Sequence, residues 1–389
     1  MKIVHLCLGD RFADNYNYQV NSLIKYQKKI GYDIEVIASC EGFDREGHMV
    51  HNLPARKYVG ECGILITRIP YKRDDKFYYR FRKFRGLKTE LEKAKPDILF
   101  MHNIQFADVP VVVRFLKENP QVIAYADNHA DFSNSAKNWL SMNIIHKVIW
   151  KRYAQMIAPY LKKIYGVLPA RVDFLEKVYE LPSSKCELLV MGADDEWVNE
   201  AKLKQNKSKI RQQYGFAESD FVVVSGGKIN QYRPETLYLM EAIIESERNN
   251  LKLLIFGNVE ESLKAKFNTL CKSDRVRFAG WQNSKETYYL MAAADLVVFP
   301  GLHSVMWEQA VALGVPCIFR DIDGFHHVDL GGNALFLKDV SSKSLQKEIE
   351  KLSLDTSLHE SMREIAESKG MKAFSYLSIA KRSIGLENI

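Results

Sequence analysis

The sequence predicts an α/β protein built from two doubly wound, Rossmann-like domains. Short β-rich apolar runs alternate with longer amphipathic segments along the chain, which is the pattern of parallel βαβ units. The alternation forms two successive series of about 190 residues each, and a chain of 389 residues suits two domains better than one. Ligands of such domains bind beyond the carboxyl ends of the strands, so we expect the functional site in a cleft between the domains.

The order of the predicted elements sets the expected domain boundaries. In the first series the first helical pattern ends at Gly31, a C-terminal stop signal. A polar, Lys-rich stretch at 199–209 separates the two series and is interpreted as the link between domains, and from about Thr356 the chain reads as helix with no later strand. We therefore expect an N-terminal domain over 1–192, a C-terminal domain over 193–370, and a last helix over 371–389 that packs back on the N-terminal domain. The predicted strands are Ile3–Leu8, Asp33–Ala38, Asp97–Met101, Val122–Tyr125 and Ile164–Leu168, then Phe221–Val224, Leu251–Phe256, Val276–Phe278, Leu296–Phe299 and Pro316–Phe319.

Composition favours a folded, soluble protein. Hydrophobic residues make up 47% of the chain, which argues against disorder. The opening MKIVHLCLGD lacks the length and cleavage site of a signal peptide, and no run approaches the roughly 20 apolar residues that span a bilayer. The six cysteines are scattered without a C-x-x-C pair, as expected of reduced thiols. We expect a cytoplasmic protein, either free or peripheral at the inner face of the cell membrane.

The basic excess lies entirely in the first half of the chain. Residues 1–190 contain 30 Lys and Arg against 21 Asp and Glu, a net charge of +9, whereas the remainder has a net charge of −2. The densest basic run, Tyr71–Lys88, holds eight cations and six aromatic residues. Its spacing predicts a basic amphipathic helix suited to an anionic membrane surface; the alternative is a solvated helix that buries only its Phe stripe. No recognition module accompanies it, so nucleic acid is not an expected partner. The residues of this predicted membrane patch are Phe77, Arg80, Phe81, Arg82, Lys83, Phe84 and Arg85.

Two loops of the second series have the chemistry of a phosphate site. In the first, a strand runs into Gly226 and Gly227, and the cations Lys228 and Arg233 follow. Glycines let the backbone approach a phosphate closely and cations neutralise it, although a tight turn with two solvated cations would have the same sequence.

The second loop follows the strand that ends before Pro300 and Gly301. Ser304 is a predicted N-cap, so the backbone N–H groups of Ser304 and Val305 would point at an anion. Glu308, one turn later, can accept hydrogen bonds from ribose hydroxyls; the alternative is a surface acid on a helix.

These motifs resemble those of glycosyltransferase family 4, enzymes of bacterial surface polysaccharide synthesis. Ala294–Pro300 followed by Glu308–Pro316 is similar to the family's donor signature, "aDvfv.PS" and then "EAmacGvPvv". Ser225–Lys228 resembles its phosphate-binding "vGrl" turn, and Val190–Asp194 resembles the "nGvD" that opens the interdomain link. Asn17–Ile37 resembles the first helix and second strand of the acceptor domain, so the resemblance covers nearly the whole chain.

The resemblance implies the GT-B fold and a role for each motif. Lys228 and Arg233 would hold the donor diphosphate, and Glu308 the nucleotide ribose. His129 matches the histidine that the family places beside the reacting sugar; it can equally be a loop-anchoring core histidine. The family retains anomeric configuration and uses neither a bound metal nor a cofactor, and a UDP-sugar is the expected donor substrate.

The sequence departs from the family at two places. Pro300 stands where the family has a first Glu facing the donor sugar, so His303 or the backbone of 301–304 would have to substitute. The usual Gly-Gly turn after the first strand is replaced by Gly9–Tyr16. Neither the donor sugar nor retention can therefore be transferred directly. The expected acceptor or sugar contacts are Asp14, Asn15, Tyr16, Asp131 and His303.

Competing site chemistries have weaker signals. The D-x-D of Asp321 and Asp323 follows a late strand, and His326-His327 lack a third ligand at useful spacing, so no metal site is expected. No G-x-G-x-x-G follows the first strand, which argues against a dehydrogenase. We expect transfer of a hexose-type sugar from a nucleotide diphosphate to a glycan, lipid-linked acceptor in cell-surface polysaccharide synthesis. The alternatives are a GT-B-fold sugar-nucleotide epimerase or phosphorylase, or a catalytically dead nucleotide-binding homologue.

Overall fold

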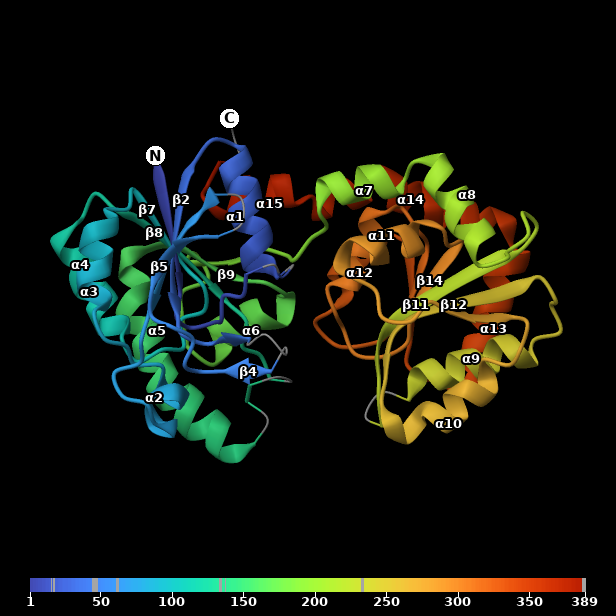
Figure 1. Cartoon of the computed structure of the whole chain (residues 1–389), viewed down its shortest axis with the longest axis horizontal. Coiled ribbons are helices and arrows are strands. Elements are labelled where there is room, and N and C mark those ends of the chain that lie inside the picture. The colour runs from blue at the N-terminus through green and yellow to red at the C-terminus, as the bar shows by residue number, and fades with distance from the viewer. Residues whose placement is uncertain are drawn as a thin grey trace. The chain divides into compact units, whose positions relative to one another are not determined.

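The chain divides into two compact units. A computed structural model describes residues 1–14, 16, 18–43, 48–60, 63–132, 135–136, 138–231 and 234–386. Unit 1 comprises Met1–Val190 with Leu377–Ile389, and unit 2 comprises Met191–Tyr376. Each unit holds one large sheet with helices on both faces (Figure 1). The predicted fold class, an α/β protein with two parallel sheets, is confirmed.

Unit 1 is built on an eight-stranded sheet in the order β10-β9-β8-β7-β1-β2-β6-β5. All neighbours are parallel except β5, which runs antiparallel to β6 at the edge. The five strands predicted for this half are present, whereas β5, β6 and β10 were not predicted. The strands of the unit are β1 (Lys2–Cys7), β2 (Asp33–Ser39), β5 (Lys57–Val59), β6 (Leu65–Ile69), β7 (Ile98–Met101), β8 (Ile123–Asn128), β9 (Leu161–Gly166) and β10 (Cys186–Leu188), with a separate hairpin of β3 (Gly42–Phe43) and β4 (Met49–Val50).

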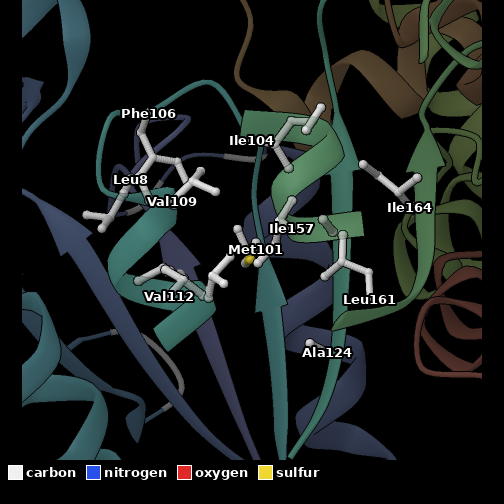
Figure 2. Packing of buried hydrophobic residues seen from close by; sticks show 14 of the residues in the cluster. Leu8, Met101, Ile104, Phe106, Val109, Val112, Ala124, Ile157, Leu161 and Ile164 are labelled. Atoms are coloured by element: carbon white, nitrogen blue, oxygen red, sulfur yellow. The ribbon is translucent and has the colours of Figure 1, made fainter. Parts of the chain in front are cut away.

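The helices of unit 1 enclose its main core. Helix α1 ends just before Gly31, the stop signal that the sequence predicted. Gly31 has a φ of 96°, a left-handed backbone conformation that glycine adopts readily. Helices α3, α4 and α5 pack on one face of the sheet, where Figure 2 shows Met101 of β7 beside Val112 and Ile157. The helices are α1 (Gln19–Lys29), α2 (Lys76–Phe81), α3 (Leu87–Ala94), α4 (Val109–Glu118), the π-helical η2 (Ser141–Trp150), α5 (Lys151–Ile157), η3 (Ala158–Tyr160), α6 (Pro169–Lys177) and the C-terminal α15 (Tyr376–Ser383).

The C-terminal segment packs on the sheet of unit 1. Tyr125 of β8 donates a hydrogen bond to the carbonyl of Ile384 at 3.0 Å. Gln27 of α1 donates to the Ser383 hydroxyl at 2.9 Å. Residues from the two ends of the chain therefore share one core.

The predicted single basic helix over Phe77–Arg85 is wrong. Helix α2 ends at Phe81 because Arg82 adopts a left-handed conformation, φ 52°. Phe84 does not continue the stripe: it is buried, and its ring stacks on Tyr71 at 4.8 Å. Phe77 alone of the three phenylalanines stays well exposed.

Unit 2 is a second parallel sheet, ordered β13-β12-β11-β14-β15-β16. The predicted link at 199–209 is wrong, because it falls largely within α7 and α8. Asp194 caps α7 through the N–H groups of Glu196 and Trp197, and Arg211 of α8 pairs with Asp295. The elements are β11 (Phe221–Ile229), β12 (Leu251–Val259), β13 (Val276–Phe278), β14 (Leu296–Phe299), β15 (Cys317–Arg320) and β16 (Ala334–Leu337), with α7 (Asp195–Ala201), α8 (Lys204–Gln213), α9 (Glu235–Glu245), α10 (Glu261–Leu270), α11 (Ser284–Ala292), α12 (Met306–Ala312), η4 (His326–Val328), α13 (Ser342–Leu354) and α14 (Thr356–Phe374).

Both sheets reverse their winding at one internal position. In unit 1 the chain runs outward from β1 to β2, then returns to start β7 on the other side of β1. In unit 2 the same reversal separates β11 from β14. Such switch points leave a crevice at the carboxyl ends of the two strands, where ligands of doubly wound sheets bind. No helix among the described residues is long and apolar enough to cross a membrane.

Candidate functional site

A pocket of about 480 Å³ opens at the switch point of unit 2. One wall is the end of β11, Ser225–Lys228. The facing wall is the loop after β14, where Pro300, Gly301 and Ser304 line the cavity. The fold therefore brings together the two loops that the sequence selected as the donor site. We call this cavity the unit 2 pocket.

The glycine pair lies in a strand and not in the predicted turn. Strand β11 continues through Gly226 and Gly227 and pairs with β12 as far as Ile229. A Cβ on Gly226 would lie 2.5 Å from the Phe256 ring, and one on Gly257 would lie 2.0 Å from the carbonyl oxygen of Gly227. The two strands approach too closely for side chains here, so this wall of the pocket presents backbone.

The predicted phosphate-binding side chains have different surroundings. Lys228 is exposed at the pocket, and no carboxylate pairs with its ammonium group in the part of the chain that the structure describes. Arg233 lies outside the described residues. Ser304 is not an N-cap as predicted: α12 begins at Met306, and the Ser304 carbonyl accepts from the Trp307 N–H at 3.0 Å. Val305 is the residue that precedes the helix, without a side-chain cap.

Glu308 is fully buried behind the pocket wall. The Nε2 atoms of His303 and His327 lie 3.0 and 2.8 Å from its Oε1. Burial alone would raise the pKa of Glu308, but the two imidazoles outweigh it and lower the pKa to about 2. Glu308 is thus an ionised carboxylate held by two histidines, and the residues that line the unit 2 pocket do not include it.

The same three side chains can hold a metal ion. One ligand atom from each of His303, Glu308 and His327 lies within 4.8 Å of the other two. The sequence argument against a metal at His326-His327 was that no third ligand lies at useful spacing. That premise is wrong, because the loop after β15 returns His327 to Glu308, 19 residues earlier in the chain. Asp321 accepts from His326 instead.

In unit 1, His129 follows β8 and faces a buried carboxylate. Its Nε2 lies 3.3 Å from Oδ1 of Asp127, and its side chain is 24% exposed. Burial alone would lower the pKa of His129, but the charge of Asp127 raises it above its usual value. Burial alone would raise the pKa of Asp127, yet His102 and His129 hold it far below its usual range. His129 is therefore a partly exposed histidine whose protonated form is favoured by the neighbouring carboxylate of Asp127.

A buried hydrogen-bond chain continues behind Asp127 to the C-terminal helix. The Ser383 hydroxyl donates to the Ala380 carbonyl, so it must accept from the Gln27 amide, whose oxygen then accepts from Nε2 of His5 at 2.6 Å. Burial, and then His102, hold the pKa of His5 well below its usual value, so its Nδ1 is an acceptor.

That acceptor fixes the proton positions on His102. Nε2 of His102 donates to His5 at 2.9 Å, and its Nδ1 donates to Oδ2 of Asp127 at 2.8 Å. His102 thus carries both protons and forms a buried ion pair with Asp127. Asp127 also accepts from the N–H of Asn103 at 2.8 Å, which fixes its orientation toward His129.

The predicted acceptor contacts are mostly engaged within the protein. Asp14 accepts from Arg68 at 3.1 Å and from the Tyr58 hydroxyl, and buried Asp131 pairs with Arg171. Tyr16 is 39% exposed and stacks on Phe43. Asn15 lies outside the described residues. The remaining candidate, His303, is in unit 2 and bonded to Glu308 as described above.

Unit 1 has its own cavity at its switch point, which the sequence did not predict. The cavity measures about 580 Å³ and is lined by Arg11, after β1, and by Asn103 and Gln105, after β7. We call it the unit 1 pocket. The sequence did offer one signal for these residues: they follow strands that a doubly wound sheet places next to each other. In unit 2, sequence reasoning also missed Trp281, 67% exposed at the rim of the unit 2 pocket.

Comparisons with known proteins match part of unit 2 to a family and both units to solved structures. The model of the family "Glycosyl transferases group 1" matches residues 206–369, which lie within unit 2. No curated protein matches the chain in sequence. Solved structures match over both units. HepE from Anabaena, solved with UDP and with UDP-glucose, has a TM-score of 0.67 and 16% identity over 98% of both chains.

Two further solved structures show the same fold. WaaG, a glycosyltransferase involved in lipopolysaccharide biosynthesis, matches at a TM-score of 0.64 and 15% identity over 99% of both chains. Sucrose-phosphate synthase from Thermosynechococcus elongatus matches at 0.65 and 14%, over 98% of this chain and 97% of its own. The chain therefore has the GT-B fold, and its residues 206–369 match the family of group 1 glycosyl transferases.

Proposed function

We propose that the chain transfers a hexose-type sugar from a nucleotide diphosphate, bound in the unit 2 pocket, to a glycan acceptor bound by unit 1. One observation carries the proposal. At the switch point of the matched unit, the side-chain-free backbone of Gly226–Gly227 and the unpaired cation of Lys228 face one cavity. Backbone N–H groups and an uncompensated cation are what a diphosphate requires.

The nucleotide follows from the other walls of the same pocket. Lys228, with Arg233, would hold the diphosphate, and the exposed indole of Trp281 offers a stacking surface for a base. Glu308 would accept from the ribose hydroxyls once His303 or His327 turns away from its Oε1. HepE binds UDP-glucose, so a UDP-sugar is the donor we propose for this chain.

His129 would stabilise charge during transfer. The bond between the sugar C1 and the diphosphate oxygen breaks, a hydroxyl oxygen of the acceptor bonds to C1 in its place, and the hydroxyl proton passes to the departing diphosphate. Cations aimed at the separating charges then do the work that a metal ion does in other transferases, so transfer would need no metal. Retention of configuration is proposed from the family resemblance.

The acceptor and its location are proposed from unit 1. Its net basic charge and the exposed side chains of Phe77, Arg80 and Arg85 suit an anionic membrane surface. A lipid-linked glycan at the cytoplasmic face of the membrane, built toward a capsule or another surface polysaccharide, fits both units. An epimerase or phosphorylase would not need a second, cationic pocket in unit 1.

Calorimetry with UDP and a panel of UDP-sugars tests the donor proposal, and product analysis with donor alone separates the alternatives. A transferase binds UDP and a UDP-sugar, and with donor alone it releases UDP slowly by hydrolysing the UDP-sugar. Conversion of the donor into its epimer would show an epimerase. Binding without any turnover, with or without acceptor, would show a dead homologue.

A further inference from the structure

We infer that the unit 1 pocket binds a phosphate or diphosphate group of the acceptor, and that this group carries an apolar chain. The inference rests on the proposed function and names the acceptor class. The pocket lies at the switch point, where Arg11 follows β1 and Asn103 follows β7. The backbone N–H of Asn103 also donates to Asp127, which pairs with His129. Asp127 thus connects a residue of the pocket lining to the proposed catalytic histidine.

The charge of the pocket is strongly positive and largely unpaired. Four cationic side chains line it, Arg11, Lys76, Arg80 and Arg82, against one carboxylate, Glu41. Glu41 is paired with Arg11 at 3.2 Å. Lys76, Arg80 and Arg82 have no carboxylate partner among the residues that the structure describes.

Two buried nitrogen atoms at the same pocket also lack partners. Nε of Arg11 and Nδ1 of His51 are inaccessible to solvent and make no hydrogen bond within the described structure. A neutral glycan would leave the three cations uncompensated, whereas a phosphate or diphosphate pairs with guanidinium groups through two parallel hydrogen bonds. A volume of about 580 Å³ accommodates such a group together with part of a sugar.

The apolar chain is inferred from η2, whose two faces differ. His146 and Trp150 of this helix line the pocket. Leu140, immediately before the helix, and Ile144 and Val148, within it, follow each other at intervals of four residues and are 42–56% exposed. The stripe does not line the pocket, but it belongs to the same segment as His146 and Trp150, which do; the occupant that we infer is therefore a lipid whose phosphate lies in the pocket.

The experiment compares two charge-matched double variants by calorimetry, with UDP present to saturate the unit 2 pocket. Lys76→Ala/Arg80→Ala removes two pocket cations, and Lys83→Ala/Arg85→Ala removes two neighbouring cations that do not line it. We expect inorganic diphosphate to bind the second variant as it binds wild type and to bind the first roughly tenfold or more weakly. Equal affinity for both variants, or none for wild type, overturns the inference.

A second ligand tests the apolar chain. Farnesyl diphosphate should bind wild type more tightly than inorganic diphosphate does, and Leu140→Ser/Ile144→Ser should remove the difference. Equal affinities in wild type would restrict the site to a free phosphate. UDP affinity is measured first, in wild type and in each variant. If wild type does not bind UDP, the donor proposal fails. The unit 1 pocket variants should bind UDP as wild type does, so a loss confined to diphosphate binding concerns the unit 1 pocket alone.

We also infer, from a separate observation, that Glu235 contacts the donor sugar. It is the only acidic residue among those that line the described unit 2 pocket, and it is nine-tenths buried. Its Oε1 accepts from Arg320 at 2.7 Å, whereas its Oε2 has no partner in the described structure. That free oxygen lies 3.8 Å from where a Cβ of Gly301 would be, next to Pro300, where the family's sugar-facing carboxylate is missing.

Glu235→Gln tests this role, with Glu245→Gln, an exposed acid at the other end of α9, as control. The amide keeps the Arg320 bond but loses one acceptor oxygen. We expect roughly tenfold weaker binding of the preferred UDP-sugar among UDP-glucose, UDP-galactose and UDP-N-acetylglucosamine, with UDP affinity unchanged. An equal loss for UDP and UDP-sugar, or no loss, contradicts it.

Discussion

The two units present pockets at the same topological position with opposite chemistry. The unit 2 pocket presents backbone at Gly226–Gly227 and one unpaired cation, Lys228. The unit 1 pocket presents side chains, three of them unpaired cations. Backbone contacts suit a constant group such as a nucleotide diphosphate, whereas side-chain contacts can be changed residue by residue for a particular acceptor. We propose that one topology thus serves two ligands, because the loops after the strands differ.

The units also differ in how their central charged group is buried. In unit 1, Asp127 is paired with a buried His102 cation and a partly exposed His129. In unit 2, Glu308 is paired with two nearly buried histidines and closed off from the pocket. In unit 1 one histidine partner of the carboxylate, His129, is therefore partly exposed, whereas both histidine partners of Glu308 are nearly buried.

Replacing Asp127 should have the largest effect on stability. Asp127→Asn leaves the His102 cation buried without its counter-charge, which costs about 3–5 kcal/mol of unfolding free energy. The depressed pKa of Asp127 means that its contribution is complete above the unfolded value near pH 4 and is lost as pH falls further. Chemical denaturation at pH 7 and below pH 4 measures this, and the gap between wild type and variant should shrink in acid. A difference in unfolding free energy that does not change with pH would show that Asp127 and His102 do not form an ion pair.

Lys228→Ala should give the largest loss of nucleotide affinity. Removing a charge-assisted hydrogen bond to diphosphate costs about 1.5–3 kcal/mol of binding free energy. Lys272→Ala, an exposed lysine of unit 2 away from the pocket, is the control for calorimetry with UDP. Equal UDP affinity in the two variants would exclude the phosphate site from the end of β11.

Trp281→Ala should weaken UDP by a similar or smaller amount. Stacking of a base on an aromatic ring is worth about 1–3 kcal/mol by alanine substitution. Trp281→Phe, which keeps a ring, should restore most of the affinity. If the phenylalanine variant binds as weakly as the alanine variant, the indole makes a polar contact and not a stacking surface.

The proposed membrane contact of unit 1 should give the smallest effect per residue. Each cation near an anionic leaflet contributes about 1 kcal/mol, and screening over about 8 Å at physiological salt reduces it. Vesicle co-sedimentation should show weaker, salt-sensitive binding of Arg80→Glu/Arg85→Glu than of Lys264→Glu/Lys272→Glu in unit 2. Equal binding of the two variants would make the basic surface of unit 1 irrelevant to membranes.

The sequence predicted what depends on local pattern. Alternation of strand and helix gave the fold class, and Gly31 gave the end of α1. The predicted helix through Phe84 failed because the N–H of Phe84 is held by Asp108, a contact 24 residues away. The 199–209 link failed because Arg211 docks on Asp295 of unit 2. Long-range contacts of this kind leave no trace in local periodicity.

The same limit applies to the site. The unit 2 pocket was predictable because its two loops are marked by glycine, proline and a cation. The partners of Glu308 could not be predicted, because His327 follows β15 and approaches Glu308, 19 residues earlier, only in the folded unit. His5, His102 and Asp127 lie on three different strands or their loops, so their chain of hydrogen bonds exists only in the folded sheet.

Hydrogen–deuterium exchange with UDP-glucose tests the central claim most directly, because it reports location. The account predicts protection of peptides that cover Ser225–Lys228 and Pro300–Met306 in unit 2, with little change at Lys76–Arg82 in unit 1. Lys228→Ala should reduce that protection at equal ligand concentration. Protection confined to unit 1, or equal protection in the variant, would contradict the placement of the donor in the unit 2 pocket.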